Sequence, residues 1–284
     1  MENYCPLSIL SIPSKIMETF VVDKLVEHIS GNHNLVSTHQ WAYEKGLSPE
    51  LLLVNMTEKR RSVLDQRKAV CAVFIDFRKA FDSVSHTNLP YKAQAHGIMG
   101  NLWKWLTDYL SNRTTVGESK SQTSSVTCGV PQGSVLGPFL FNLYTDDLPL
   151  VINTQENTSI EMYAEDTTIY CIADDVDTVI AATNRALALI TELCIVNAMT
   201  LHPIKCKAML LYRSVFIGPI QALTTNNVII NFINSVRCLG VFIDNILSWT
   251  PHLKETIKSF ARKLSQLKHL SFYKTITWND SISK

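Results

Sequence analysis

Apolar residues recur every three or four positions in several parts of this chain, which is the spacing of one face of a helix. The clearest stripe runs from Val176 to Cys194 and predicts a helix over residues 175–197, capped at its start by Asp174 or Asp175. The same periodicity predicts further helices from Pro13-Ser14 to Gly31, over about 49–66, through Leu102 to Leu110, over 139–147, and from Thr250-Pro251 onward.

Shorter apolar runs between these helices are typical of strands. Residues 69–76 are nearly all apolar and β-prone, as in a strand buried on both faces. Two runs, about 159–164 and 167–173, flank a tight acidic turn at Glu165-Asp166. Further strands are expected near 208–213, 227–232 and 236–243, with a hairpin or loop over 111–128. Strands mixed with helices predict an α+β fold with a partly antiparallel sheet.

Composition narrows the class of protein. The 284 residues are 46% hydrophobic and 18% charged, with 10 Gly and 10 Pro, which excludes disordered and fibrous chains. Because Lys+Arg 26 and Asp+Glu 25 nearly balance, any surface that binds nucleic acid must be local. The seven cysteines form no C-x-x-C pair, so we expect buried free thiols in a reducing compartment.

The sequence predicts no targeting peptide and no membrane-spanning segment. No run approaches the ~20 apolar residues of a membrane span. Charged residues in the first 30 positions interrupt any signal-peptide core. We therefore expect an intracellular protein, in the nucleus or cytoplasm, with no membrane partner.

Carboxylates at strand ends are the first candidate chemistry. Asp76 closes one predicted strand, and Glu165 and Asp166 lie between two others. If these strands are neighbours, three carboxylates converge, as two Mg²⁺ ions ~4 Å apart require for phosphoryl transfer. A solvated acidic turn is the alternative. The pairs Asp146-Asp147 and Asp174-Asp175 show how common such acidic runs are, and the second pair begins a helix.

Longer motifs surround these carboxylates. They are Val73-Phe-Ile-Asp76-Phe-Arg-Lys-Ala-Phe81-Asp82-Ser-Val-Ser-His86, then Cys128-Gly-Val-Pro-Gln-Gly-Ser-Val-Leu-Gly-Pro138, then Tyr163-Ala164-Glu165-Asp166-Thr-Thr. Blocks at 197–205, 238–241 and 248–252 follow, and an opening segment lies at 3–8. In content and order these blocks resemble the reverse transcriptases of non-LTR (LINE-type, jockey- or CR1-like) retrotransposons.

The resemblance implies a right-hand polymerase with an antiparallel palm sheet packed on helices. Residues 1–70 would be fingers, 71–245 palm with a fingers insertion around 85–128, and 246–284 the start of the thumb. The implied activity is RNA-directed DNA synthesis. It uses an RNA template, a DNA primer, dNTPs and two Mg²⁺ ions, for which Mn²⁺ can substitute.

The resemblance also assigns roles around the metal and the nucleotide. Asp76, Glu165 and Asp166 would be catalytic metal ligands. Lys205 would lie near the triphosphate as a proton donor to pyrophosphate, with a solvated lysine as the alternative. Phe81 would exclude a 2′-OH, with a core aromatic as the alternative. Two loops would contact nucleotide and template, through Gln132, Gly133 and Lys45.

Two further assignments concern the primer and the duplex. Leu239 and Gly240 would form the primer-grip turn. A basic patch on the last predicted helix would neutralise phosphates, with a solvated helix face as the alternative. This patch consists of Lys254, Lys258, Arg262 and Lys263.

The chain departs from the family pattern at functional positions. Glu165 stands where the family has aspartate, which adds one methylene at a metal that tolerates little deviation in geometry. The segment from Gln40 to Pro49 resembles a family segment with two arginines, here replaced by Glu44 and Leu47. We therefore predict an impaired polymerase, in a decayed or truncated copy of an element or in a partial gene model.

Three alternatives stay open at this point. The first is a catalytically dead domain that binds RNA or an RNA–DNA hybrid. The second is an expressed relic without a ligand. The third is a group II intron maturase, against which Ser248-Trp249-x-Pro251-His252 favours the retrotransposon family.

Overall fold

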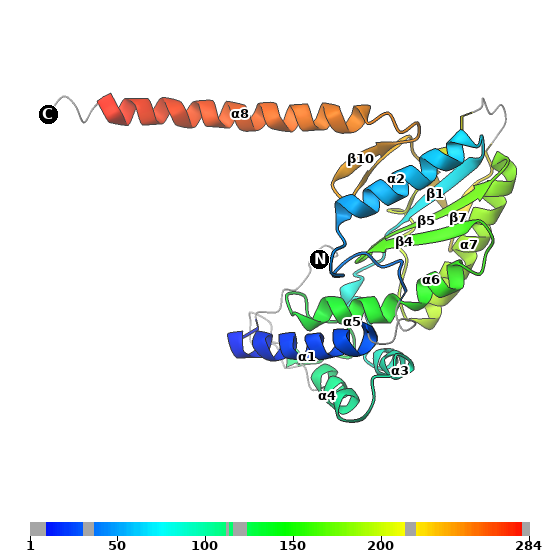
Figure 1. The fold of residues 1–284 in the computed structure, drawn as a ribbon, viewed down its shortest axis with the longest axis vertical. Helices are drawn as coiled ribbons and strands as arrows, with labels where there is room; N and C mark the ends of the chain where they lie inside the picture. The colour runs from blue at the N-terminus through cyan, green and yellow to red at the C-terminus, as the bar shows by residue number, and fades with distance from the viewer. Residues whose placement is uncertain (1–9, 31–36, 112–113, 116–123, 214–219, 280–284) are drawn as a thin grey trace. The chain divides into compact units, whose positions relative to one another are not determined.

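The computed structural model describes residues 10–30, 37–111, 114–115, 124–213 and 220–279. The predicted opening block at 3–8 lies outside these residues. Internal contacts divide the chain into two units, Met1–Phe232 and Ile233–Lys284. Figure 1 labels the helices and some of the strands of the two units.

A six-stranded sheet forms the centre of the first unit. Its strands run in the order β4-β5-β1-β6-β8-β7. Their bounds are β1 Ala69–Ile75, β4 Thr158–Tyr163, β5 Asp166–Ala173, β6 Lys207–Leu211, β7 Leu223–Thr225 and β8 Val228–Phe232. Four neighbouring pairs are antiparallel, and β6 and β8 are parallel. The expected antiparallel sheet is therefore correct except at that one pair.

Helices cover both faces of this sheet (Figure 1). Successive residues of a strand point to opposite faces. Cys71 and Val73 of β1 join the core cluster that contains the buried residues of helix α7 (Val176–Val196). On the other face, helix α2 (Pro49–Asp65) packs on β1, and the Arg60 guanidinium lies 5.6 Å from the centre of the Phe74 ring. β1 is thus buried on both sides, as its unbroken apolar run predicts.

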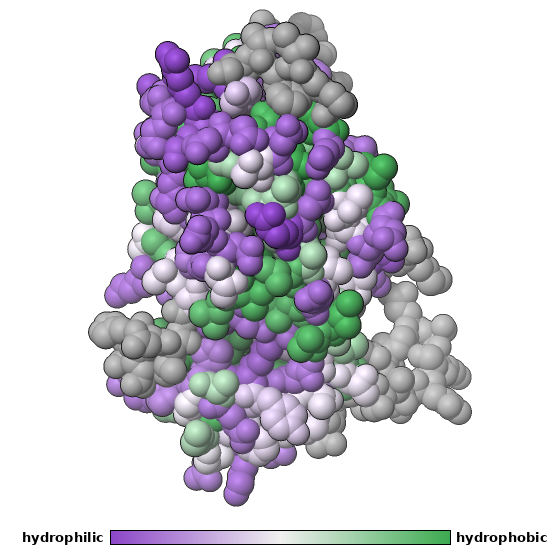
Figure 2. Space-filling view, turned by 90° about the vertical axis from the view of Figure 1, so that its right-hand side faces the viewer, coloured by the Kyte–Doolittle hydropathy of each residue, from purple (hydrophilic) through white to green (hydrophobic). Residues whose placement is uncertain are grey.

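Helix α7 is long and apolar enough to cross a bilayer by length and composition. Asp177, Arg185 and Glu192 interrupt its apolar residues, so it is not an unbroken apolar run of that length. One face of α7 is also buried against the sheet, and the core helix of a folded domain passes the same test. Figure 2 shows hydrophilic side chains over most of the face in view, with smaller apolar areas between them.

Helix α6 (Asp147–Ile152) packs on β4 and α7. A second group of helices packs beyond one end of the sheet (Figure 1). They are α1 Ile12–Ser30, α3 Asn88–Ala95, α4 Gly100–Leu110 and α5 Leu136–Thr145. The buried Glu18 carboxylate of α1 joins three of them. It accepts hydrogen bonds from Val135 N at 2.8 Å, at the start of α5, and from the Tyr109 hydroxyl of α4 at 2.8 Å. A carboxylate at this end of α5 also complements the helix dipole.

The acidic pair Asp146-Asp147 is a structural junction. Asp146 accepts hydrogen bonds from Ser37 N at 2.7 Å and pairs with His96 Nε2 at 2.9 Å. Asp147 pairs with Lys92 Nζ of α3 at 2.8 Å and accepts from the Asn197 amide at 3.0 Å. Each carboxylate therefore has partners from segments distant in the sequence, which accounts for both without a ligand.

The second unit contains a hairpin and a long helix. Strands β9 (Ser235–Cys238) and β10 (Val241–Asp244) pair antiparallel, and α8 spans Thr250–Asn279. The single strand predicted over 236–243 is thus two strands. Leu239 and Gly240 form the tight turn between β9 and β10, and their φ angles of 47° and 84° suit such a turn. In the first unit, β2 (Thr114–Thr115) pairs with β3 (Ser124–Ser125), within the predicted hairpin region.

Candidate active site

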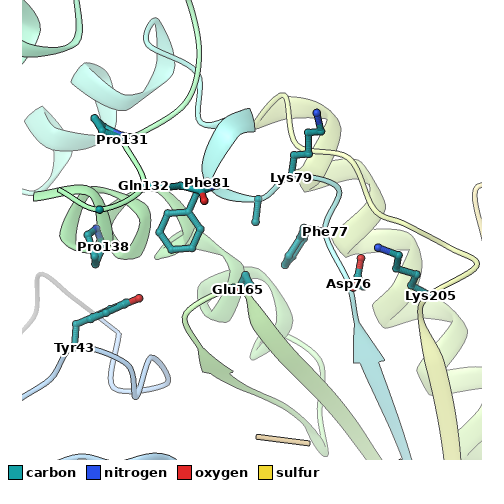
Figure 3. Close-up of a pocket in the computed structure, with 12 residues that line it drawn as sticks. Tyr43, Asp76, Phe77, Lys79, Phe81, Pro131, Gln132, Pro138, Glu165 and Lys205 are labelled. Atoms are coloured by element: carbon teal, nitrogen blue, oxygen red, sulfur yellow. The ribbon is translucent and has the colours of Figure 1, made fainter. Parts of the chain in front are cut away.

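A cavity of about 500 Å³ opens at the end of the sheet where β1 stops and β4 turns into β5 (Figure 3). Half of its lining was predicted from the sequence: Asp76, Phe81, Gln132, Gly133, Glu165 and Lys205. The other half was missed: Tyr43, Phe77, Lys79, Ala80, Pro131 and Pro138. These residues come from segments that are far apart along the chain, so only the fold brings them together.

Asp76 lies where the register of the sheet places it. Ile75 is opposite Thr167 in the antiparallel β1–β5 pair, so Asp76 and Asp166 occupy the next positions on the two strands. The backbone of Asp76 is held from the other side of β1. Its carbonyl accepts from His202 N at 2.8 Å, and its N–H donates to Cys206 Sγ at 3.5 Å.

The same contacts bring Lys205 to the cavity. Lys205 N donates to His202 O at 2.9 Å, closing a turn beside Asp76. The Lys205 side chain is exposed, and Figure 3 shows it next to Asp76. Within the described parts of the chain, no carboxylate comes within 4.0 Å of its ammonium group. Its charge is therefore available to an anion in the cavity.

The β4–β5 turn carries the second carboxylate. Tyr163 pairs with Asp166, so the central residues of the turn are Ala164 and Glu165. The predicted turn at Glu165-Asp166 was thus displaced by one residue, and Asp166 is the first residue of β5. Ala164 has a φ of 52°, in the left-handed region. Glu165 is exposed and lines the cavity.

The three carboxylates interact electrostatically. Partial burial, and then the charges of Glu165 and Asp76, raise the pKa of Asp166 above its usual value. All three offer oxygen ligands, and their mutual repulsion is what a bound divalent cation relieves. Among the residues that the structure describes, no three acidic, His or Cys side chains are close enough to form a ready ion cage. In donor chemistry and charge the group fits Mg²⁺, but its side chains are not preassembled around one point.

Phe81 forms one wall of the cavity. Its ring stacks on Phe141 of α5, with centroids 4.5 Å apart and planes at 21°. The backbone carbonyl of Phe81 accepts from Val130 N at 2.9 Å. The aromatic thus belongs partly to the core and partly to the cavity. Its exclusion of a 2′-OH stays a prediction.

The glycine-rich loop packs directly against the Phe81 segment. Gly129 N donates to Val84 O at 2.7 Å. A side chain at Gly129 would bring Cβ within 3.1 Å of the Asp82 carbonyl oxygen, and its φ of 95° also favours glycine. The Gln132 amide donates to Asp82 Oδ1 at 3.1 Å. Gln132 and Gly133 are therefore held at the cavity by a fixed loop.

The segment around Tyr43 differs from the expectation. Tyr43, with a φ of 65°, lines the cavity, whereas Lys45 is exposed and is not part of the lining. Partial burial and the Glu165 charge raise the pKa of the Tyr43 hydroxyl. Partial burial likewise raises the pKa of Glu44. Within this segment, sequence reasoning missed Tyr43, because the turn conformation decides which side chain faces inward.

The remaining predicted residues belong to the second unit. Leu239 and Gly240 form the β9–β10 turn. Lys254, Lys258, Arg262 and Lys263 are all exposed on α8. Their roles in gripping a primer or a duplex stay predictions.

Comparison with known proteins identifies the family of this chain. The profile of the family described as "Reverse transcriptase (RNA-dependent DNA polymerase)" matches residues 1–272. The chain belongs to the reverse transcriptase family. This reverse transcriptase domain is 27% identical over 283 residues to the "Probable RNA-directed DNA polymerase from transposon BS" of Drosophila melanogaster. It is 22% identical over 277 residues to the "RNA-directed DNA polymerase from mobile element jockey" of the same organism.

These relatives place the domain with the reverse transcriptases of non-LTR retrotransposons, as the motifs predicted. Each alignment covers 95% of this chain and 30% of the relative, so the chain spans about a third of the length of these curated relatives. Among solved structures, the apo telomerase of Candida tropicalis matches 83% of this chain and 44% of its own. The TM-score is 0.51 at 11% sequence identity, which confirms the polymerase fold.

Proposed function

We propose that this reverse transcriptase domain copies an RNA template into DNA, with the primer 3′-OH attacking the α-phosphate of a dNTP. One observation carries the proposal. A single cavity gathers the carboxylates Asp76 and Glu165, the cation Lys205 and the aromatic Phe81 from separate segments. These are the groups that nucleotidyl transfer needs: metal ligands, a phosphate-binding cation and a wall against the sugar.

Asp76, Glu165 and Asp166 would hold two Mg²⁺ ions, with Mn²⁺ able to replace them. When bound, such ions stabilise negative charge on the attacking and leaving oxygens. Burial, and then the charges of Glu165 and Asp76, raise the pKa of Asp166. The repulsive part supports this role, because it is relieved when cations bind between the carboxylates.

The other residues of the cavity would position the nucleotide. The exposed ammonium groups of Lys205 and Lys79 would bind the triphosphate, and Lys205 would give a proton to the leaving pyrophosphate. The Phe81 ring, fixed against Phe141, would leave no room for a 2′-OH. Gln132 and Gly133 would support the template base and the incoming nucleotide.

We also propose that Glu165 impairs this polymerase. Its extra methylene moves the carboxylate relative to that of an aspartate, and a misplacement of about 1 Å costs roughly 100-fold in rate. Glu44, in place of an arginine, puts a negative charge next in sequence to Tyr43 of the cavity lining, which would repel a triphosphate. Both changes act against turnover.

Primer extension on an RNA template tests the polymerase and its impairment together. We expect incorporation by the unchanged chain to be weak, and Glu165→Asp to raise it about 100-fold in Mg²⁺. Near-equal rates for the two proteins would overturn the impairment. No incorporation by either protein, in Mg²⁺ or Mn²⁺, would contradict polymerase activity in this chain.

A binding-only domain is the second candidate, favoured by the exposed cations of α8. Lys258 and Arg262 are four residues apart and therefore share one face of the helix. If α8 binds phosphates, changing both to Gln should lower the slope of log Kd against log salt by about 1.4 to 1.8 for single-stranded RNA or duplex. Lys24→Gln, an ion-paired lysine of α1, serves as the control. Equal slopes for all three proteins would exclude the patch.

A further inference from the structure

The segment that precedes Tyr43 is joined to the edge of the sheet beside the β4–β5 turn. Gln40 bridges to Met162 of β4 in parallel. Trp41 N donates to Met162 O at 2.9 Å, and Met162 N donates to His39 O at 2.9 Å. Residues 39–41 therefore act as a short additional strand that ends where Ala164 and Glu165 begin the turn.

The Gln40 side chain reaches across this junction and holds one residue of the turn. It is buried, with 5% of its surface exposed. Its Oε1 accepts from Ala164 N at 2.9 Å and from Ala42 N at 3.1 Å, and its Nε2 donates to Ala164 O at 3.3 Å. Because two N–H groups face the same atom of the amide, that atom must be the oxygen, which fixes the orientation of the side chain.

Ala164 needs such support. Its φ of 52° lies in the left-handed region, which a residue with a Cβ seldom adopts. It is also buried, with 6% of its surface exposed, so water is a poor substitute partner for its N–H and C=O. Strained conformations persist only where the surroundings fix them, and here Gln40 binds both polar groups of the strained residue.

We propose that Gln40 is a positioning residue that fixes the β4–β5 turn and thereby sets where the Glu165 carboxylate lies in the cavity. The positioning of a metal ligand rests on the proposed function, whereas the hold on the turn does not. Gln40 thus links the segment that carries Tyr43 to the turn that carries Glu165. One side chain therefore holds the two segments that bring Tyr43 and Glu165 to the cavity.

A neighbouring contact provides a matched control. Trp41 Nε1 donates to Glu161 Oε2 of β4 at 2.7 Å, and Lys59 Nζ pairs with Glu161 Oε1 at 2.6 Å. Trp41→Phe removes one buried hydrogen bond between the same segment and the same strand, but leaves Ala164 untouched. Gln40→Met keeps a similar volume and removes all three hydrogen bonds of the amide.

The experiment compares the unchanged chain with Gln40→Met, Trp41→Phe and Asp76→Asn. Amide hydrogen exchange is measured for a peptide spanning the turn at 163–166 and for one from β1. Mn²⁺ affinity is measured by electron paramagnetic resonance, with Asp76→Asn identifying the site. We expect Gln40→Met to speed exchange at the turn at least about tenfold relative to β1 and to weaken Mn²⁺ binding about tenfold, and Trp41→Phe to do neither.

The outcomes separate this proposal from the proposed function. Unchanged hydrogen exchange at the turn in Gln40→Met overturns the proposal. Faster exchange at the turn also overturns it if Gln40→Met keeps full Mn²⁺ affinity at the site that Asp76→Asn removes. Equal effects of Gln40→Met and Trp41→Phe would show a general loss of stability and would also overturn it. If the unchanged chain binds no Mn²⁺ that depends on Asp76, the metal chemistry of the proposed function fails, and exchange at the turn alone decides the role of Gln40.

Discussion

Phe81 lies between the core and the cavity, and its two contacts have separate consequences. Stacking on Phe141 ties the ring to α5, while the opposite side faces the space where a sugar would lie. Under the proposed function, a flat ring fixed in this way would discriminate by shape, because it would leave an added hydroxyl no room. Sugar selectivity should therefore depend on this one side chain.

We expect Phe81→Ala, tested in a Glu165→Asp background, to raise the ratio of ribonucleotide to deoxyribonucleotide incorporation by about 10- to 100-fold. Single-nucleotide kinetics with matched dNTP and rNTP measure this ratio. Phe139→Ala, a nearby aromatic of α5 outside the cavity lining, should leave it unchanged. An unchanged ratio in Phe81→Ala would remove Phe81 from sugar selection.

Sequence motifs predicted some of the residues that line the cavity, whereas backbone conformation determines which other side chains face it. Asp76 and Lys205 could be predicted because their blocks are long enough to align with a family. Tyr43 and Lys79 could not, since both have positive φ, which turns their side chains in a direction that sequence patterns do not specify. The sequence pattern likewise predicted Lys45 as a nucleotide contact, whereas the turn brings Tyr43 and not Lys45 into the lining.

At the scale of elements, periodicity worked where a helix or strand is long and buried on a defined face. The predicted 175–197 became Val176–Val196, and 69–76 became Ala69–Ile75. The helices α3 and α6 were missed, because eight and six residues are too short to show a stripe. The predicted strand 236–243 continued across Leu239 because its apolar pattern does not break at the turn.

The junction between α3 and α5 should make stability depend on pH. Burial alone would lower the pKa of His96. The hydrogen bond to Asp146, the hydrogen bond to the Lys92 carbonyl and the Asp146 charge outweigh it and raise the pKa above the usual 6.5. A raised folded-state pKa stabilises the fold below the unfolded value, and this contribution is lost as pH rises through the folded value.

We therefore expect His96→Gln to cost about 1 to 3 kcal/mol of unfolding free energy at pH 5.5, and clearly less at pH 8.5. Urea unfolding at the two pH values measures the difference. Asp146→Asn should remove the same pH dependence, because it removes the partner of the imidazolium. A cost for His96→Gln that does not change with pH would contradict this account of the junction.

At the scale of the molecule, the sequence could predict an α+β polymerase fold but not the order of its sheet. β1 lies between β5 and β6, which are separated from it by about a hundred residues of chain, and β6 pairs in parallel with β8. Such pairings follow from long-range packing that no local pattern records. The placement of Asp76, Glu165 and Asp166 at one end of the sheet is a product of this order. Their positions at strand ends made them candidates, but only the family resemblance indicated that the strands are neighbours.

The most direct test of the central claim is RNA-templated primer extension by Glu165→Asp, compared with Glu165→Asp/Asp76→Asn. If the carboxylates at the end of β1 and β5 are the catalytic centre, the second protein should lose at least about 100-fold in incorporation while keeping its unfolding midpoint. Equal incorporation by the two proteins would contradict the account, because synthesis would then not depend on the carboxylate that the sheet brings beside Asp166.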